Sequence, residues 1–90
     1  MNTEQLFNYY AQKVKESKPT DKPIDNNTRL NFYKYYKQAT VGNNNTEQPY
    51  FFNVADRAKW DAWNEIKNMS KEEAMKMYIY HASQYISSPP

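Results

Sequence analysis

The sequence contains no cysteine and only one glycine among its 90 residues. Without cysteine, the protein has no disulfide bonds, no thiolate nucleophile and no cysteine-based zinc site. A single glycine is too few for a fold with many tight turns, and helix-forming residues are plentiful, so the composition favours α-helices. A chain of this length has room for one hydrophobic core, so we expect residues 1–90 to form a single domain.

Long hydrophobic runs and a strong net charge are also missing. No stretch approaches the roughly 20 apolar residues of a membrane-spanning helix, and the N-terminus lacks the apolar segment of a secretion signal. We therefore expect a cytoplasmic protein without stable membrane insertion. The net charge of +2 is too small for a general nucleic-acid-binding protein, so no nucleic-acid partner is expected.

Aromatic residues are abundant, with nine Tyr, four Phe and two Trp, and they can fill a core. In four segments, apolar side chains recur at the three- and four-residue spacing of an amphipathic helix. The first segment carries Phe7, Tyr10 and Val14 on one stripe. We expect this helix to end before Pro19 and Pro23, which disfavour helical backbone.

The second segment runs from about residue 27 to residue 41, and Phe32, Tyr36 and Ala39 form its apolar stripe. Gly42 follows, at a position where left-handed backbone commonly ends a helix. The next residues, 43–54, are turn formers followed by aromatics. A loop of this length in a small domain is usually functional or packed by its own side chains.

The third segment covers residues 55–68 and places Trp63 on its apolar arc. Ser70 and Glu73 have the spacing of a capping box and predict the start of the fourth helix. Residues 74–86 of that helix carry two adjoining apolar faces, so it can contact two neighbours. The sequence therefore predicts an all-α four-helix bundle with a long loop between its second and third helices.

Catalytic and metal-binding patterns are absent from the sequence. His81 is the only histidine, and no serine stands in a context that would activate it as a nucleophile. The acidic residues are scattered and do not have the spacing of metal ligands. His81 lies on a mostly apolar face, where a hydrogen-bonded packing residue is the usual interpretation. We expect no enzymatic activity, no metal and no cofactor.

A cluster on the second helix has two interpretations. Tyr33, Tyr36 and Lys37 occur at i, i+3 and i+4, so they project to the same side, and Lys59 and Tyr78 from other helices could complete the group. The tyrosines could simply pack half-buried between helices while Lys37 extends into water. Alternatively, the cluster could be a shallow site where an aromatic base stacks and lysines meet phosphate.

Four ordered motifs resemble the acyl-CoA-binding protein family: YKQATVG at 36–42, NTEQP at 45–49, AKWDAWN at 58–64 and SKEEAMKMYI at 70–79. The resemblance covers the whole chain and is looser in the first helix. It implies a four-helix bundle in an up-down-down-up arrangement, which agrees with the long loop. It also implies a carrier that binds and buffers medium- to long-chain acyl-CoA esters without covalent chemistry.

The resemblance further implies a set of ligand-binding residues. Lys59 matches the lysine before the first tryptophan, which resembles the partner of the ribose 3′-phosphate. The six positions that match the family's ligand contacts are Lys15, Tyr33, Tyr36, Lys37, Lys59 and Tyr78. Four further positions fall at the adenine or acyl edge of the site: Tyr10, Ala11, Arg29 and Leu30.

Some positions depart from the family pattern. Gln48 stands where a basic residue is usual, Tyr50 where glycine is frequent, and Ala55 where many members have lysine. Arg29 stands where an apolar residue commonly lines the acyl path. These departures bear on the affinity and the preferred chain length, and not on the class of ligand.

An interaction module is the alternative function. A small helical bundle could use its exposed tyrosines to bind a partner protein, and its binding would then be insensitive to long-chain acyl-CoA. In either case the apolar helical stripes can be satisfied within one chain, so we expect a monomer.

Overall fold

The computed structural model describes residues 1–16 and 24–90. These residues form four helices: α1 (Thr3–Glu16), α2 (Asn26–Thr40), α3 (Val54–Glu65) and α4 (Lys71–Ala82). The predicted all-α, four-helix architecture is confirmed. The predicted third helix was too long, because the backbone leaves the α-helical path after Glu65. Pro19 and Pro23, predicted to follow the first helix, lie outside the described residues.

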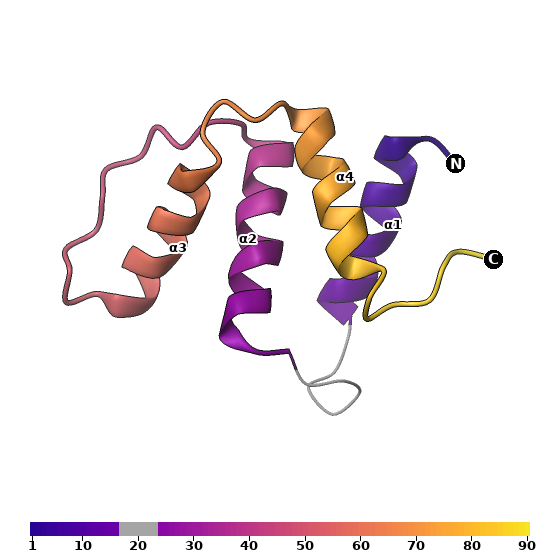
Figure 1. Ribbon diagram of the computed structural model, residues 1–90, viewed down its shortest axis with the longest axis horizontal. Helices are drawn as coiled ribbons and strands as arrows, with labels where there is room; N and C mark the ends of the chain where they lie inside the picture. Colours follow the sequence, from indigo (N-terminus) through magenta and orange to yellow (C-terminus); the bar gives the residue numbers. More distant parts are fainter. Residues whose placement is uncertain (17–23) are drawn as a thin grey trace.

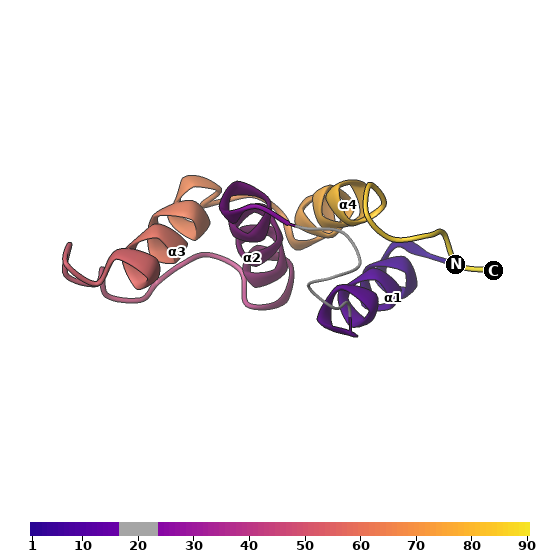
Figure 2. The same cartoon turned by 90° about the horizontal axis from the view of Figure 1, so that it is seen from below.

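Helices α3, α2 and α4 lie in a row, and α1 lies below α4 in the view of Figure 2. Helices α1 and α4 run in one direction and α2 and α3 in the opposite one, which is the predicted up-down-down-up arrangement (Figure 1). Helix α2 packs against both α3 and α4, and α1 packs against α4. The fold measures 43 × 31 × 15 Å. Helix α2 therefore has a different neighbour on each side, α3 on one and α4 on the other.

Side chains next to the helices define where they begin and end. The carboxylate of Asp25 accepts a hydrogen bond from the backbone N–H of Thr28 at 2.7 Å, which satisfies a donor in the first turn of α2. Ser70 Oγ likewise accepts from Glu73 N at 3.0 Å, as the capping spacing predicts. Gly42 has φ 101°, which confirms the left-handed end of α2.

The hydrophobic core lies between α1, α2 and α4. The Tyr78 ring is 3% exposed, and its centroid lies 5.2 Å from that of Phe7 and 5.5 Å from that of Phe32. Ala74 and Ala82 on α4 are completely buried, and their small side chains allow the neighbouring helices to approach closely. The aromatic residues predicted from the helical stripes therefore do form a core.

The buried stripe of α2 differs from the predicted one in one respect. Tyr35 is buried, whereas Tyr36 remains 45% exposed. Tyr35 stacks on His81 of α4 with ring centroids 5.4 Å apart. Burial, followed by the nearby charge of Lys34, lowers the pKa of His81. The geometry of His81 is that of a packing residue.

Tryptophan and asparagine side chains hold the loop between α2 and α3. The Trp63 Nε1–H donates to Gly42 O at 2.8 Å, and the Trp60 Nε1–H donates to Thr46 O at 3.0 Å. Asn44 is buried and donates through Nδ2 to Trp60 O at 3.3 Å. The loop is therefore packed by its own side chains and by α3, as its length suggested.

Gln38 connects the same loop to the start of α4. Its amide nitrogen donates to Asn43 Oδ1 at 2.9 Å and to Met69 O at 2.8 Å, while the side chain is only 1% exposed. Asn43 Oδ1 also accepts from Asn68 N at 2.7 Å. These amides fix the two connections on either side of α3 to each other.

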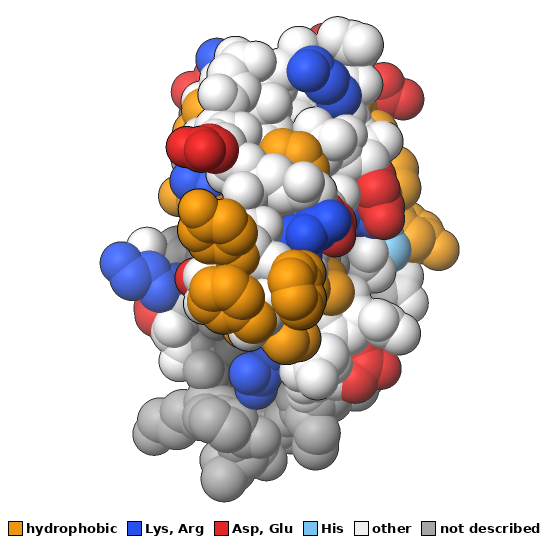
Figure 3. Space-filling model, turned by 90° about the vertical axis from the view of Figure 1, so that its left-hand side faces the viewer, with side chains coloured by type: hydrophobic (Ala, Val, Ile, Leu, Met, Phe, Trp, Pro, Cys, Tyr) orange, Lys and Arg blue, Asp and Glu red, His pale blue; other side chains and the backbone are white. Residues whose placement is uncertain are grey.

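No helix within the described residues combines the length and the apolar character needed to cross a membrane. Exposed apolar side chains do gather at the end of the molecule formed by α3 and the loop before it (Figure 3). They belong to Tyr50, Phe51, Phe52 and Val54.

Candidate functional site

Two cavities flank α2. A cavity of about 300 Å³ lies between α2, α3 and their connecting loop, and we call it the α2–α3 cavity. A cavity of about 690 Å³ lies between α1, α2 and α4, and we call it the α1–α2–α4 cavity. Tyr33 and Lys37 line the first, whereas Tyr36 and Thr40 line the second. Residues three apart point about 60° apart around a helix, so α2 presents one face to each cavity.

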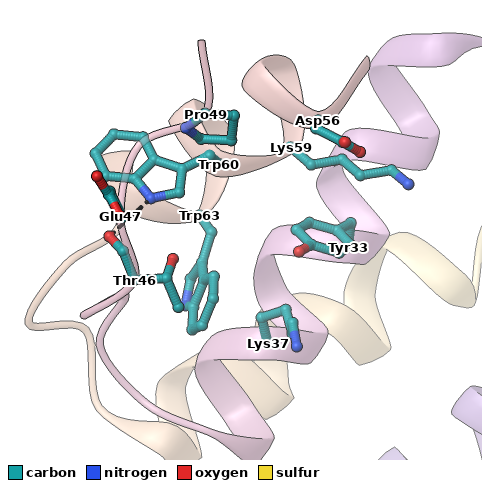
Figure 4. Close-up of a pocket in the computed structure, with 9 residues that line it drawn as sticks. All are labelled: Tyr33, Lys37, Thr46, Glu47, Pro49, Asp56, Lys59, Trp60 and Trp63. Carbon is teal, nitrogen blue, oxygen red and sulfur yellow. Dashed lines mark hydrogen bonds between the residues drawn. The ribbon is translucent and has the colours of Figure 1, made fainter. Parts of the chain in front are cut away.

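Two lysines face the α2–α3 cavity from opposite helices. Tyr33 and Lys37 project from α2 into the same space as Lys59 and Trp63 of α3 (Figure 4). Lys37 Nζ lies 5.2 Å from the centroid of the Trp63 ring, and Lys59 Nζ lies 5.8 Å from the centroid of the Tyr33 ring. Neither lysine forms an ion pair with any residue in the described part of the chain. Contacts with ring faces leave ammonium N–H groups available for an anion.

Acidic side chains also reach this cavity. Asp56 and Glu47 are both part of its lining (Figure 4). Burial, and after it the charge of Asp56, raises the pKa of Tyr33. The Tyr33 hydroxyl therefore stays protonated at neutral pH and can donate a hydrogen bond. Neither acid was predicted as a site residue, although Asp56 lies three residues before Lys59, a spacing that makes them neighbours on a helix.

The α1–α2–α4 cavity is lined by three aromatic residues that contact one another. The ring centroids of Tyr36 and Tyr78 are 6.2 Å apart, and Phe7 stacks on Tyr36 at 5.9 Å. Burial, followed by the neighbouring Tyr36, raises the pKa of Tyr78 to about 12. Aromatic faces beside Lys15 suit a flat ring that carries or adjoins negative charge. The full lining is Phe7, Asn8, Ala11, Gln12, Val14, Lys15, Tyr36, Thr40 and Tyr78.

The structure thus brings most of the predicted ligand residues to these two cavities. Tyr10, Arg29 and Leu30 are the exceptions, since none of them is among the described residues that line either cavity. Tyr10 is buried in the core, while Arg29 is exposed at the start of α2 and Leu30 is half-buried. Thr46, Pro49 and Trp60 line the α2–α3 cavity and were not predicted as site residues.

Sequence comparison places these features in a known family. Residues 4–82 match the family model described as "Acyl CoA binding protein". The chain is 46% identical over 83 residues to the acyl-CoA-binding protein of Saccharomyces cerevisiae, and the match covers 92% of each protein. It is 45% identical over 84 residues to acyl-CoA-binding domain-containing protein 3 of Oryza sativa subsp. japonica. That match covers 93% of this chain and 52% of the rice protein, so the chain spans about half of that relative's length.

Structural comparison leads to the same family. The fold is similar to the crystal structure of acyl-CoA-binding protein 2 of Oryza sativa, with a TM-score of 0.82 and 43% sequence identity. The superposition covers 93% of this chain and 90% of the rice chain. The chain therefore belongs to the acyl-CoA-binding protein family.

Proposed function

We propose that this protein binds long-chain acyl-CoA esters without covalent chemistry, and that it carries and buffers them in the cytoplasm as a monomer. Residues 1–90 act as a single binding domain, with no cofactor and no catalytic step. One observation carries most of the support: the six predicted ligand positions come from all four helices, and each of them lines one of the two cavities on either side of α2. His81 lines neither cavity, and it stacks on Tyr35 instead.

The α2–α3 cavity is the site we propose for the ribose 3′-phosphate. Lys37 and Lys59 approach from two helices, and Tyr33 adds a neutral hydroxyl donor between them. A hydrogen bond between charged partners contributes about 1.5–3 kcal/mol. The acids Glu47 and Asp56 offset part of the positive charge, so the phosphate is held by specific donors more than by a strong overall field.

The α1–α2–α4 cavity is the site we propose for the adenine ring. Tyr36 is 45% exposed and offers an aromatic face, while Tyr78, Ala11 and Lys15 complete the lining from α4 and α1. Stacking a base on an aromatic ring contributes roughly 1–3 kcal/mol. Tyr78 is protonated at neutral pH, because burial raises its pKa to about 12.

The acyl chain follows the start of α2 in this proposal, past the edge positions Arg29 and Leu30. Each buried methylene contributes about 0.8 kcal/mol, so eight of them add about 6 kcal/mol. The exposed Arg29 can place its alkyl stem along the chain while its guanidinium stays in water. This contribution makes acyl-CoA a far better ligand than CoA alone.

Calorimetric titration with palmitoyl-CoA, CoA and palmitate tests the proposal. We expect tight one-to-one binding of palmitoyl-CoA and weak binding of both fragments, because CoA lacks the acyl chain and palmitate lacks the phosphate. Absence of palmitoyl-CoA binding would contradict the proposal and would favour a protein–protein interaction surface for the exposed tyrosines. Sedimentation of the same samples checks the monomeric state.

A further inference from the structure

A patch of exposed apolar side chains, formed by Tyr50, Phe51, Phe52 and Val54, takes no part in either cavity lining among the described residues. These side chains are between 66% and 79% exposed. Figure 3 shows apolar side chains gathered at this end of the molecule. Four side chains of this size expose an apolar area on the order of 500 Å². Patches of that size on a monomer are often functional.

The patch has an ordered local structure. Asn53 N donates to Tyr50 O at 3.0 Å, which closes a turn with Phe51 and Phe52 at its tip. The rings of Tyr50 and Phe52 stack in parallel with centroids 5.5 Å apart, and Phe51 meets Phe52 edge-on at 5.9 Å. Because the turn and the ring contacts already fix these side chains, docking them costs little conformational entropy.

From these features we infer that the patch docks on the lipid–water interface of a membrane. A second copy of the chain fits less well, since a stable interface needs about 800 Å² from each partner. A role as a peptide-binding groove is also a poor match for the patch. Phe51 is 79% exposed, so its ring stands on the surface and does not line a cleft. Tyrosine rings suit the boundary between headgroups and acyl chains, and phenylalanine rings suit the apolar layer just below it.

The charges of the sequence segment that carries the patch indicate which kind of membrane it fits. Two basic and three acidic side chains lie between residues 45 and 61, which gives this segment a net charge of −1. Anionic lipids therefore offer no electrostatic gain, and docking depends on the buried apolar area. We expect shallow docking on a zwitterionic surface, with little dependence on salt. This docking differs from stable insertion, which would require a spanning helix.

The position of the patch connects it to ligand exchange, and this part of the inference rests on the proposed function. Pro49 and Asp56 line the α2–α3 cavity, and the patch residues lie between them in the sequence. A long acyl chain partitions into bilayers. Docking at this turn places the cavity next to the surface where such a ligand resides, so the protein can take up or release it there.

Flotation with phosphatidylcholine vesicles tests the docking surface, using the parent protein and the double variant Phe51→Ser/Phe52→Ser. Tyr80→Ser is the matched control, because Tyr80 is an aromatic residue on α4 that is 61% exposed and lies outside the patch. We expect the double variant to partition at least about tenfold more weakly than the parent. The control should float like the parent, and added phosphatidylserine should not strengthen binding. Circular dichroism confirms that each variant is folded.

Three results would overturn the inference: a parent that does not float, a double variant that floats equally well, or a parent dimer that the double variant abolishes. Titration with palmitoyl-CoA in the absence of vesicles separates this inference from the proposed function. The double variant should bind the soluble ligand as the parent does, yet extract it from vesicles more slowly. Flotation without palmitoyl-CoA binding would contradict only the proposed function, and binding without flotation would contradict only the docking surface.

Discussion

The two sides of α2 are built from different interactions. On the side of α4 and α1, Phe7, Phe32 and Tyr78 pack ring against ring. On the side of α3, the ammonium group of Lys37 lies over the Trp63 ring, and the indole N–H of Trp63 donates to the carbonyl of Gly42. One side thus depends on apolar packing and the other on hydrogen bonds and charge.

This difference suits a ligand with unlike parts. Aromatic packing provides a neutral surface for a flat base, while lysines supported by ring faces provide donors for phosphate. In the proposed site a single helix would serve both parts of the ligand, because Tyr33 and Lys37 line one cavity and Tyr36 lines the other. Substitutions can test each side of α2 separately. The predictions begin with a loss of fold stability and end with a change in the pH dependence of stability.

The largest effect should come from Trp63→Ala on the α3 side. The side chain is 4% exposed, and its removal leaves a cavity and an unpaired carbonyl at Gly42. We expect the free energy of unfolding to fall by about 3–5 kcal/mol in urea denaturation. Trp63→Phe keeps most of the ring and should lose less. Trp60→Ala, at a half-buried position, is the matched control, and an equal loss there would contradict the special role of Trp63.

A smaller effect is expected for Lys59→Ala, which should leave stability intact and weaken binding. Removing one charged donor should lower the affinity for palmitoyl-CoA about 10- to 100-fold, as measured by calorimetry. Lys67→Ala is the control, because Lys67 is an exposed lysine beyond the end of α3 that does not line either described cavity. If both variants bound as the parent does, Lys59 would have no part in the site.

Gly42→Ala should destabilise the fold by about 1–2 kcal/mol. The cause is backbone strain, because a residue with a Cβ rarely adopts φ 101°. A steric clash is not the cause, since an added Cβ would lie 3.7 Å from Lys71 Cε, an ordinary contact distance. This substitution also tests the α3 side of α2, since the carbonyl of Gly42 accepts the hydrogen bond from Trp63. We expect a lower midpoint in thermal unfolding with little change in ligand affinity, and an unchanged midpoint would show that the turn tolerates alanine.

The last effect appears only at alkaline pH. Burial raises the pKa of Tyr78 from its usual value near 10 to about 12. Below pH 10 the phenol is protonated in both folded and unfolded chains, so its contribution to stability is constant. Between pH 10 and 12 the unfolded chain loses the proton first, so stability falls as pH rises. In denaturation curves recorded between pH 10 and 12, the free energy of unfolding of Tyr78→Phe should fall less steeply with pH than that of the parent. Tyr33→Phe on the α3 side should show a smaller change in slope. An unchanged slope for Tyr78→Phe would contradict the shift.

The sequence predicted the aromatic side of the molecule better than the α3 side. Helical spacing identified Phe7, Phe32 and Tyr78, because packing between helices follows a regular period. Spacing on the second helix grouped Tyr33, Tyr36 and Lys37, and the resemblance to the family added Lys15 and the roles in ligand binding. The roles of Gln38 and Asn44 were not foreseen, because an amide that bonds to a distant backbone group has no periodic pattern in the sequence.

The most direct test of the two-sided site compares palmitoyl-CoA with its analogue lacking the 3′-phosphate, each titrated into the parent protein and into Lys59→Ala. If Lys59 holds that phosphate, the parent should bind the analogue at least about tenfold more weakly than palmitoyl-CoA, whereas Lys59→Ala should distinguish the two ligands by no more than about twofold. If the parent and the variant discriminated between the two ligands equally, the phosphate would lie elsewhere and the assignment of the α2–α3 cavity would be wrong.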